Sequence, residues 1–424
     1  MAKLKYKPIN LGRWLVWGGT ALLMVVLPLI LTAGFTLTLL SQIGIGIIFA
    51  LSYNMLLGQG GMLSFGHAVY SGLGAYFTVH ALNLIGKGAF YFPVTLVPLI
   101  GGAAGIVFGV IFGYVTTKKS GTTFAMISLG IGEMVAACSL MFPGFFGGEG
   151  GITTNRVIGQ PFLGISYGPS IQVYYLIVAW ALACMAAMFA WTQTPLGRMA
   201  NAVRDNPERA EFVGYDTHMV RFLTLVISSF FAGVAGGLNC INYEIVTADN
   251  VGALRSAGVL MATFIGGAGF FFGPVIGSIV FFTMVTAVGA VTKAWAFYLG
   301  LLFLLIVLYA PGGFASLIVM HVPVIKARLM RRLWLPYAAT VVTGLVLLIG
   351  LMSLVEITYH YSLEASTAPE MTLFGFTFNV TDGTPWAIAI GLLVGGFVVS
   401  RFAWNAVGRA WGDIVHILQD RAVA

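Results

Sequence analysis

Charged side chains are scarce in this chain of 424 residues, where Asp, Glu, Lys and Arg together make up only 8% of the sequence. A soluble globular domain carries about 25% charged residues, so this chain lacks the polar groups that would cover a water-facing surface. Instead, 59% of its residues are hydrophobic and its mean hydropathy is +0.95. Glycine occupies 55 positions, and glycine is frequent where transmembrane helices pack closely. The composition predicts an all-α fold, a polytopic bundle of transmembrane helices.

Cysteines and the common catalytic motifs are also few or absent. The three cysteines, Cys138, Cys184 and Cys240, each fall inside an apolar segment, and their spacing indicates neither a disulfide framework nor a zinc site. The sequence contains no GxxxxGK(S/T) phosphate loop and no HExxH. We therefore expect no catalytic residue, no metal site and no cofactor bound by this chain.

Apolar stretches long enough to cross a bilayer recur along the whole sequence. A crossing takes about 20 residues at 1.5 Å rise each. The first stretch follows a basic flank and is too long for a signal-peptide core, so we expect an uncleaved helix. Residues 1–320 are interpreted as a transmembrane domain of about ten helices, and 321–424 as a C-terminal extension with two more. The predicted helices lie near 14–33, 36–57, 62–83, 92–115, 122–142, 171–192, 219–241, 255–269, 273–291, 295–310, 335–355 and 386–403.

The positions of Lys and Arg predict the orientation in the membrane. An alternating path that starts in the cytoplasm places residues 116–121, 193–218, 321–334 and 401–424 on the cytoplasmic side. Most of the 21 basic residues lie in these regions, in the N-terminal flank or at the helix end, as Arg221 does. The exceptions are Lys87, Arg156, Arg255 and Lys293. The predicted outer loop at 356–385 has Glu356, Glu364, Glu370 and Asp382 but no basic residue. The positive-inside rule thus predicts that both termini are cytoplasmic, and the net charge of +7 indicates contact with membrane lipid, not with nucleic acid.

Two glycine-rich patterns predict how particular helices pack. Gly101, Gly105, Gly109 and Gly113 are spaced four residues apart, so they form one flat stripe that lets a neighbouring helix approach closely. Pro274 and the run at 266–269 interrupt the apolar tract at 255–291, which predicts a helix pair joined by an irregular turn. Non-helical backbone at membrane depth is tolerated only where protein or a water-filled cavity satisfies its polar groups.

Two ionisable residues lie within or beside predicted spans. His67, in Ser64-Phe65-Gly66-His67-Ala68, is interpreted either as a hydrogen-bonded packing residue or as a substrate ligand. Glu133 is an acid inside a predicted span and should face the protein interior, because an intramembrane carboxylate is costly unless it is paired or hydrated. For Glu133 we weigh a structural or gating role against direct substrate contact.

The longest polar stretch between spans runs from Thr194 to Gly214. Pro207 follows Asn206 at a helix-start position, Glu208 and Glu211 suit the positive end of a helix, and Gly214 can end it. We predict a short cytoplasmic helix at about 198–214 that is suited to docking another protein, with an ordinary solvated loop as the alternative.

This stretch resembles the coupling-helix loop in the permease subunits of ATP-binding-cassette importers, and is most similar to the branched-chain amino acid permease family of the LivM type. The resemblance covers about residues 35–316, although Met62 stands where relatives often have a polar residue. The chain continues for about 100 residues past the turn at 309–314 where the family usually ends. The matching motifs are Arg204-Asp205-Asn206, Ala210-Glu211 and Gly214, the segments 51–68 and 72–76, and the segments 122–133, 148–152, 265–274 and 309–314.

The resemblance implies a permease of the bacterial inner membrane that works with a second, LivH-like permease and an external solute-binding protein. Two cytoplasmic ATPase subunits would bind ATP and Mg. The implied ATPase-coupling residues are Arg204, Asp205, Asn206, Glu208, Ala210, Glu211 and Gly214. The implied translocation path includes Asn54, Gln59, Ser64, His67 and Glu133.

The solute implied by default is a branched-chain or other hydrophobic amino acid, with urea, short amides and aromatic acids as open alternatives. Two other functions are open alternatives: a secondary transporter driven by an ion gradient, and a membrane-embedded enzyme or assembly scaffold.

Overall fold

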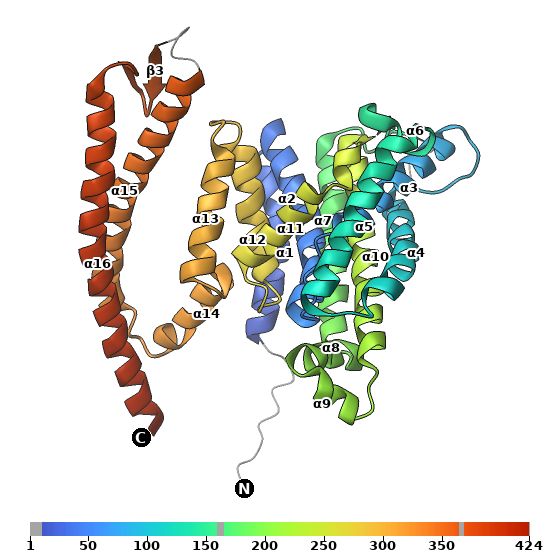
Figure 1. The fold of residues 1–424 in the computed structure, drawn as a ribbon, viewed down its shortest axis with the longest axis horizontal. Coiled ribbons are helices and arrows are strands. Elements are labelled where there is room, and N and C mark those ends of the chain that lie inside the picture. Colours follow the sequence, from blue (N-terminus) through green and yellow to red (C-terminus); the bar gives the residue numbers. More distant parts are fainter. Residues whose placement is uncertain (1–10, 159–164, 364–368, 424) are drawn as a thin grey trace. The chain divides into compact units, whose positions relative to one another are not determined.

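The computed structural model describes residues 11–158, 165–363 and 369–423 (Figure 1). Lys3, Lys5 and Lys7 of the predicted N-terminal basic flank, and Glu364 of the predicted outer loop, lie outside these residues. The side chain of Arg13, also in that flank, is likewise not described. The described chain is almost entirely helical, and its two sheets have two strands each. The prediction of an all-α, polytopic bundle is therefore confirmed.

Among the described residues, seven helical segments are long and apolar enough to cross a membrane. They are α2 with its π-helical continuation η1 (Gly34–Gln59), the segment Val94–Thr116 formed by η2 (Val94–Leu96) and α4 (Pro98–Thr116), α5 (Gly121–Met141), α7 (Ser170–Gln193), α10 (Thr217–Tyr243), α15 (Arg331–Leu363) and α16 (Gly383–Val423). A bent pair, α13 (Trp295–Tyr309) and α14 (Gly313–Lys326), makes an eighth if it is counted as one span. The helices α1 (Leu11–Ile30) and α3 (Ala68–Gly86) occupy two further predicted stretches.

The sequence-based boundaries were wrong near the C-terminus. Helix α14 was not among the predicted helices; it begins at Gly313, at the turn where the resembled family usually ends. Helix α15 runs to Leu363 and α16 runs to Val423, well past the predicted ends near 355 and 403. A search for apolar stretches finds only the hydrophobic part of a helix. It misses the more polar turns that continue the same helix.

The chain divides into two compact units. The first, here called the core unit, runs up to Ala287 and includes Leu302–Ala315. The second, here called the terminal unit, consists of Val288–Leu301 and Ser316–Ala424. Each unit has its own hydrophobic packing, and the large buried cluster of the core unit involves α2, α3, α7 and α10.

The glycine stripe of α4 lies against α10, which confirms the predicted close helix contact. A Cβ atom built on Gly101 would lie 2.5 Å from the carbonyl oxygen of Gly233, and one on Gly109 would lie 2.9 Å from Cβ of Ser229. At the other end of the stripe, a Cβ on Gly113 would lie 2.9 Å from Cδ2 of Leu225. The start of α4 therefore meets the end of α10, so the two helices are antiparallel and their backbones are nearly in contact.

The predicted helix pair in the 255–291 tract is also present. Helix α11 (Ala253–Gly266) and α12 (Gly273–Phe282), with its π-helical continuation η5 (Thr283–Val288), are joined by a turn in which Gly267 has φ +109°. Only glycine adopts this backbone conformation without strain. Helix α2 packs against both members of the pair. The interrupted pair of α11 and α12 therefore lies beside a continuous helix.

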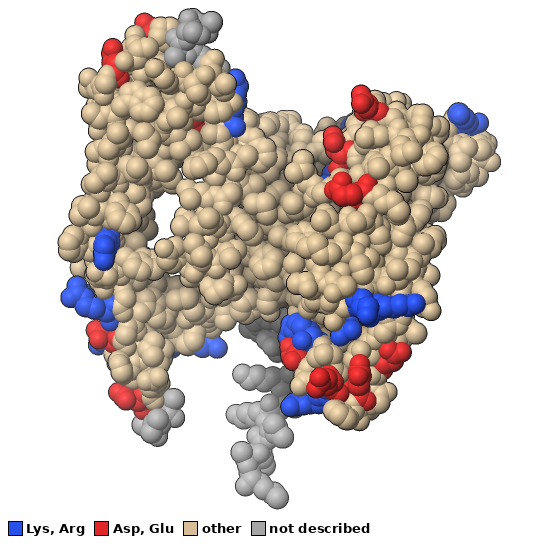
Figure 2. Space-filling model, in the orientation of Figure 1, with Lys and Arg blue, Asp and Glu red and all other residues tan. Residues whose placement is uncertain are grey.

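The two ends of the core unit carry different small elements. At one end, β1 (Ile152–Thr153) pairs antiparallel with β2 (Ile245–Val246), near the short elements α6 (Pro143–Phe146), η3 (Gly148–Gly150) and η4 (Ala248–Asn250). The guanidinium of Arg156 supports this end, because its Nε donates to the carbonyl of Tyr167 at 2.8 Å. At the other end lie α8 (Pro195–Asp205) and α9 (Pro207–Phe212). Figure 2 shows charged side chains gathered towards both ends of this unit, with a largely uncharged surface between them.

The terminal unit is built on an antiparallel pair of long helices, α15 and α16. They are linked by a hairpin of β3 (Glu370–Leu373) and β4 (Phe376–Asn379), and a Cβ on Gly350 would lie 2.9 Å from Cα of Leu393, so the two backbones are close. Glu356 was expected in an outer loop, but it lies within α15. Its carboxylate accepts hydrogen bonds from the hydroxyls of Thr292 at 2.5 Å and Tyr298 at 2.8 Å. These bonds explain how an acid is accommodated on an apolar helix.

Candidate functional site

The stretch expected as one helix over 198–214 forms two helices. Helix α8 ends at Asp205, Asn206 is extended, and α9 begins at Pro207. Proline disfavours helical backbone in the residue before it, and Asn206 then caps α9 by accepting a hydrogen bond from the backbone N–H of Arg209 at 2.9 Å. The predicted start at Pro207 is confirmed, and Gly214 has φ +92° just past the end of α9. The error was to extend one helix through a pre-proline residue.

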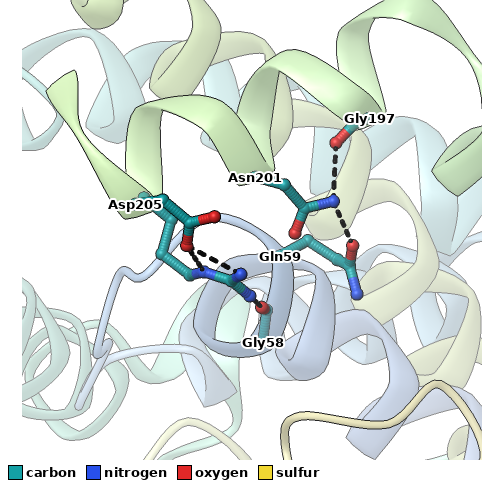
Figure 3. Close-up of polar contacts among 6 residues, drawn as sticks. Gly58, Gln59, Gly197, Asn201 and Asp205 are labelled. Atoms are coloured by element: carbon teal, nitrogen blue, oxygen red, sulfur yellow. Dashed lines mark hydrogen bonds and ion pairs between the residues drawn. The ribbon is translucent and has the colours of Figure 1, made fainter. Parts of the chain in front are cut away.

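Helix α8 is bonded directly to the π-helical end of α2, as Figure 3 shows. The side-chain amide of Asn201 donates to Oε1 of Gln59 at 2.8 Å, and Arg204 donates from Nη1 to the carbonyl of Gly58. Asp205 holds the same guanidinium through a bond from Nε of 2.9 Å. Gly61 makes room for this contact, because a Cβ there would lie 2.6 Å from Cγ of Arg204. Gln59, expected in the translocation path, thus lies against the predicted coupling element.

Helix α9 presents apolar side chains outward. Phe212 is 91% exposed and Val213 is 71% exposed, whereas Ala210 is buried. Beside them, α8 and α9 enclose a groove of about 290 Å³ whose wall includes Met199 and Tyr215. Large exposed apolar groups at the end of an otherwise polar element are typical of a protein-docking surface. Phe212 was not among the predicted coupling residues, most of which are charged or polar.

His67 is buried inside the core unit. Its side chain is fully buried, its Nε2 lies 3.0 Å from Oγ of Ser52, and its ring stacks on Phe49 with the centroids 5.5 Å apart. Asn54 and Ser64 are each only 2% exposed. These three residues of the expected translocation path therefore lie within the packed interior around α2 and α3.

Glu133 differs from the expectation that it would face the interior, because it is exposed on the surface of this chain. The buried face of α5 is formed by residues such as Phe124, Ser128, Gly132 and Val135, and Glu133 lies just off that face. Periodicity identifies which side of a helix is apolar, but on an almost wholly apolar helix it does not separate an inner face from an outer one.

A cavity of about 430 Å³ lies between α2, the end of α10, α11 and the η5 segment. None of the five residues expected in the path, Asn54, Gln59, Ser64, His67 and Glu133, is among the residues that line it. The polar groups in its wall are instead Gln42, Asn239, Tyr243, Thr247, Asn250, Arg255 and Thr286. One feature of the sequence distinguishes Arg255: it is one of four basic residues outside the predicted cytoplasmic regions.

The polar groups of this cavity are arranged in two hydrogen-bonded clusters. Gln42 donates to the hydroxyl of Tyr243, and Oε1 of Gln42 accepts from Thr286 at 2.5 Å. In the second cluster, Oδ1 of Asn250 accepts from Nη1 of Arg255 at 3.0 Å and from the amide of Asn239 at 3.3 Å. Apolar side chains fill the rest of the wall. A cavity of this size and composition is typical of a site for a small ligand with both polar and apolar parts.

The family model described as "Branched-chain amino acid transport system / permease component" matches residues 35–311. Because the match covers more than half of the chain, the chain belongs to this family of transport permeases.

Two relatives are similar over most of their lengths. Both bear the description "High-affinity branched-chain amino acid transport system permease protein LivM". The protein from Escherichia coli (strain K12) is 26% identical over 69% of this chain and 72% of its own length. The protein from Salmonella typhimurium (strain LT2) is 26% identical over 63% of this chain and 67% of its own length. No solved structure matches the chain. The family and the apolar helices together define a multi-pass membrane protein of a transport system.

Proposed function

We propose that this chain is one permease half of an ATP-driven importer for branched-chain or other hydrophobic amino acids. The permease contributes no catalytic group of its own, and ATP and Mg bind to two separate ATPase subunits. A second, LivH-like permease completes the translocation path, and an external solute-binding protein delivers the solute. The family match and the described relatives support the transport role, whereas the ATP-driven mechanism rests on the geometry of α8 and α9.

The observation that carries this proposal is the direct connection between α8 and α2. The bonds Asn201–Gln59 and Arg204–Gly58 join α8 to η1 (Met55–Gln59), and η1 continues α2, whose Gln42 and Phe49 line the 430 Å³ cavity. A push on α8 and α9 therefore reaches the cavity wall through one continuous helix. Such a connection suits a transporter in which a separate ATPase drives the change of access.

The proposal places the end of the core unit that carries α8 and α9 in the cytoplasm. Lys118 and Lys119 follow the end of α4, which packs beside the start of α10, so these lysines share that end with α8 and α9. Basic residues gather on the cytoplasmic side of membrane proteins. The opposite end, with β1 and β2, then faces the external solute-binding protein.

A second permease subunit is supported by the exposure of Glu133. A carboxylate on the lipid-facing surface of a spanning helix costs at least about 2.5 kcal/mol, and α5 exposes it beside Met126 and Met134, which are 61% and 49% exposed. Contact with a polar group of a partner helix would remove this cost. We therefore place the α5 face at the interface with the second permease.

The proposed function is tested by uptake into liposomes that contain this chain, the LivH-like permease, the ATPase subunits and the binding protein. We expect uptake of leucine only when ATP and the ATPase subunits are both present. Uptake that follows a sodium or proton gradient without the ATPase subunits would favour a secondary transporter. A complete absence of uptake by an assembled complex would favour the scaffold alternative.

The purified chain alone is expected to hydrolyse no ATP, because its sequence holds no phosphate-binding loop. Phosphate release is measured after two orthogonal purification steps that remove contaminating ATPases. Hydrolysis that follows the concentration of this chain through both steps would contradict the assignment of ATP to separate subunits.

Replacing Phe212 with alanine is expected to weaken the binding of the ATPase subunits to the permease. An aromatic anchor at the centre of an interface typically contributes at least about 2 kcal/mol, which is roughly a 30-fold loss of affinity at 1.4 kcal/mol per tenfold. The measurement is recovery of ATPase subunits with tagged permease. Tyr91→Ala is the matched control, because Tyr91 is 64% exposed and precedes the start of α4 at the opposite end of the core unit. Equal recovery with both variants would exclude Phe212 as an anchor.

A further inference from the structure

Arg255 occupies a position that helix physics disfavours. It is the third residue of α11, and the first turn of a helix carries a partial positive charge that repels a cation. The side chain nevertheless lines the cavity, with its guanidinium carbon 5.9 Å from the centre of the Phe49 ring. A cation held at the positive end of a helix makes the cavity attractive to an anion.

The charge of Arg255 has no counter-ion in this chain. Among the described residues, no carboxylate lies within ion-pair distance of it, and none of the described residues that line the cavity is acidic. The guanidinium has five donors; Nη1 bonds to Asn250, and Nε is buried without an acceptor. An ionisable side chain in the interior of a membrane protein marks a functional position by default. Asn250 holds the guanidinium in place without neutralising it.

The remainder of the cavity suits a compact apolar body. Ile45, Phe49, Phe281 and Val285 contribute to the wall, and the volume of about 430 Å³ lies in the lower part of the range for small-ligand sites. The cavity is reached from outside the chain, since Leu254 on its wall is 91% exposed. The hydroxyl of Tyr243 and the side-chain amide of Gln42 also line the cavity, where they are hydrogen-bonded to each other.

We propose that this cavity binds the carboxylate of a small apolar acid, with Arg255 as the carboxylate ligand and the aliphatic and aromatic wall around the hydrocarbon part. This inference deepens the proposed function, on which its transport test rests, by assigning a solute site within the chain. The ligand is either an α-amino acid or a simple carboxylic acid, since both supply the same group to Arg255. Urea and short amides are disfavoured, because a neutral solute leaves the arginine charge uncompensated.

Binding is tested on the purified full chain in lipid nanodiscs by labelling arginine with phenylglyoxal and following each residue by mass spectrometry. Leucine and 4-methylpentanoate are compared with 4-methylpentanamide and urea. At ten times its Kd, a bound acid should slow the labelling of Arg255 about tenfold by mass action. Arg198 is the internal reference, because it is exposed on α8 at the other end of the core unit.

Each result of the labelling experiment decides the proposal. Slowing by both acids and by neither neutral compound supports a carboxylate site, and slowing by leucine alone supports a site restricted to amino acids. Equal slowing by the acid and the amide overturns the proposal, as does unchanged labelling of Arg255. Slowing of Arg198 to the same extent also overturns it, since the effect would then not be local to the cavity.

Transport by the reconstituted complex provides an independent test. With the binding protein saturated with leucine, Arg255→Gln should lower the maximal uptake rate about 10- to 100-fold, the range for a lost charge-assisted bond. Arg255→Lys should fall between this variant and the natural protein, because it keeps the charge and loses the planar fork. Lys87→Gln is the matched control: it removes the same charge from an exposed loop residue that does not line the cavity.

The two proposals fail in different ways. If the natural complex shows no ATP-dependent uptake, the proposed function is wrong, and the labelling experiment still decides whether the cavity binds a carboxylate. If the natural complex transports leucine and Arg255→Gln transports it at the same rate, the carboxylate site is wrong and the importer assignment stands.

Discussion

Replacing Gly105 with leucine is expected to prevent normal packing of α4 on α10 and to leave little folded protein. A Cβ at this position already overlaps the backbone carbonyl of Ser229, and backbone cannot swing aside as a side chain can. Overpacking of a core typically costs about 1–3 kcal/mol, and here the whole helix must move away, so we expect a loss at the top of that range. The measurements are the yield of monodisperse protein in detergent and its apparent Tm.

Gly18→Leu is the matched control for this experiment. Gly18 is also a helical glycine in an apolar segment, but a Cβ built there has no atom within 4 Å. The control should fold with an unchanged or slightly higher Tm, because leucine favours helix more than glycine does. Similar Tm values for Gly105→Leu and the natural protein would mean that α4 and α10 do not pack as closely as described.

Reversing the charge of Glu211 is expected to cost about 2–5 kcal/mol of docking energy between the permease and its ATPase, if the residue meets a partner group there. Its carboxylate is exposed and accepts a hydrogen bond from the hydroxyl of Thr217 at 2.7 Å. Glu211→Lys removes this bond and presents a cation to the docking surface. The expected phenotype is a folded permease that recovers little ATPase and supports little uptake.

Two further variants separate the docking effect from other causes. Glu211→Gln keeps an acceptor for Thr217 and removes only the charge, so its loss should be smaller. Glu370→Lys makes the same charge change at an exposed residue of β3 in the terminal unit and should leave both ATPase recovery and uptake unchanged. Normal recovery with Glu211→Lys would exclude a role for this carboxylate in docking.

The features predicted well from the sequence are those that repeat along a single helix. The stripe from Gly101 to Gly113 is a local pattern, and its spacing predicts a close helix contact. That the partner is α10 is known only from the structure. The start of α9 at Pro207 is equally local. The break at Asn206 was also accessible, because the restriction on a residue before proline is a rule of neighbouring residues.

The cavity could not be found in the same way. Its polar groups come from segments far apart in the sequence: Gln42 from α2, Tyr243 from α10, Arg255 from α11 and Thr286 from η5. None of these belongs to a recurring pattern, and each would be unremarkable alone. The sequence instead drew attention to His67, which lies in a short motif and whose ring packs against Phe49 and Ser52.

Glu133 illustrates a different limit. A charge within the membrane requires polar neighbours, because its burial in an apolar environment is costly. This cost does not determine whether those neighbours belong to the same chain or to another one. Because α5 is apolar almost all round, composition alone does not separate the face that packs on the rest of the chain from the faces that do not. Only the packing of α5 against the rest of the chain identifies which face is left open.

The unbroken run of helix from Gly34 to Gln59 has a mechanical consequence for the proposed transport cycle. This run has 26 residues, which at 1.5 Å each is a rod about 39 Å long. Gln42 stands about 25 Å along the rod from Gln59 by the same rise, so a tilt of about 5° at the α8 end would swing Gln42 by about 2 Å. The rod would thus act as a lever arm. A small rotation of α8 would displace Gln42 by about the van der Waals radius of a methyl group, with every hydrogen bond within the helix left intact.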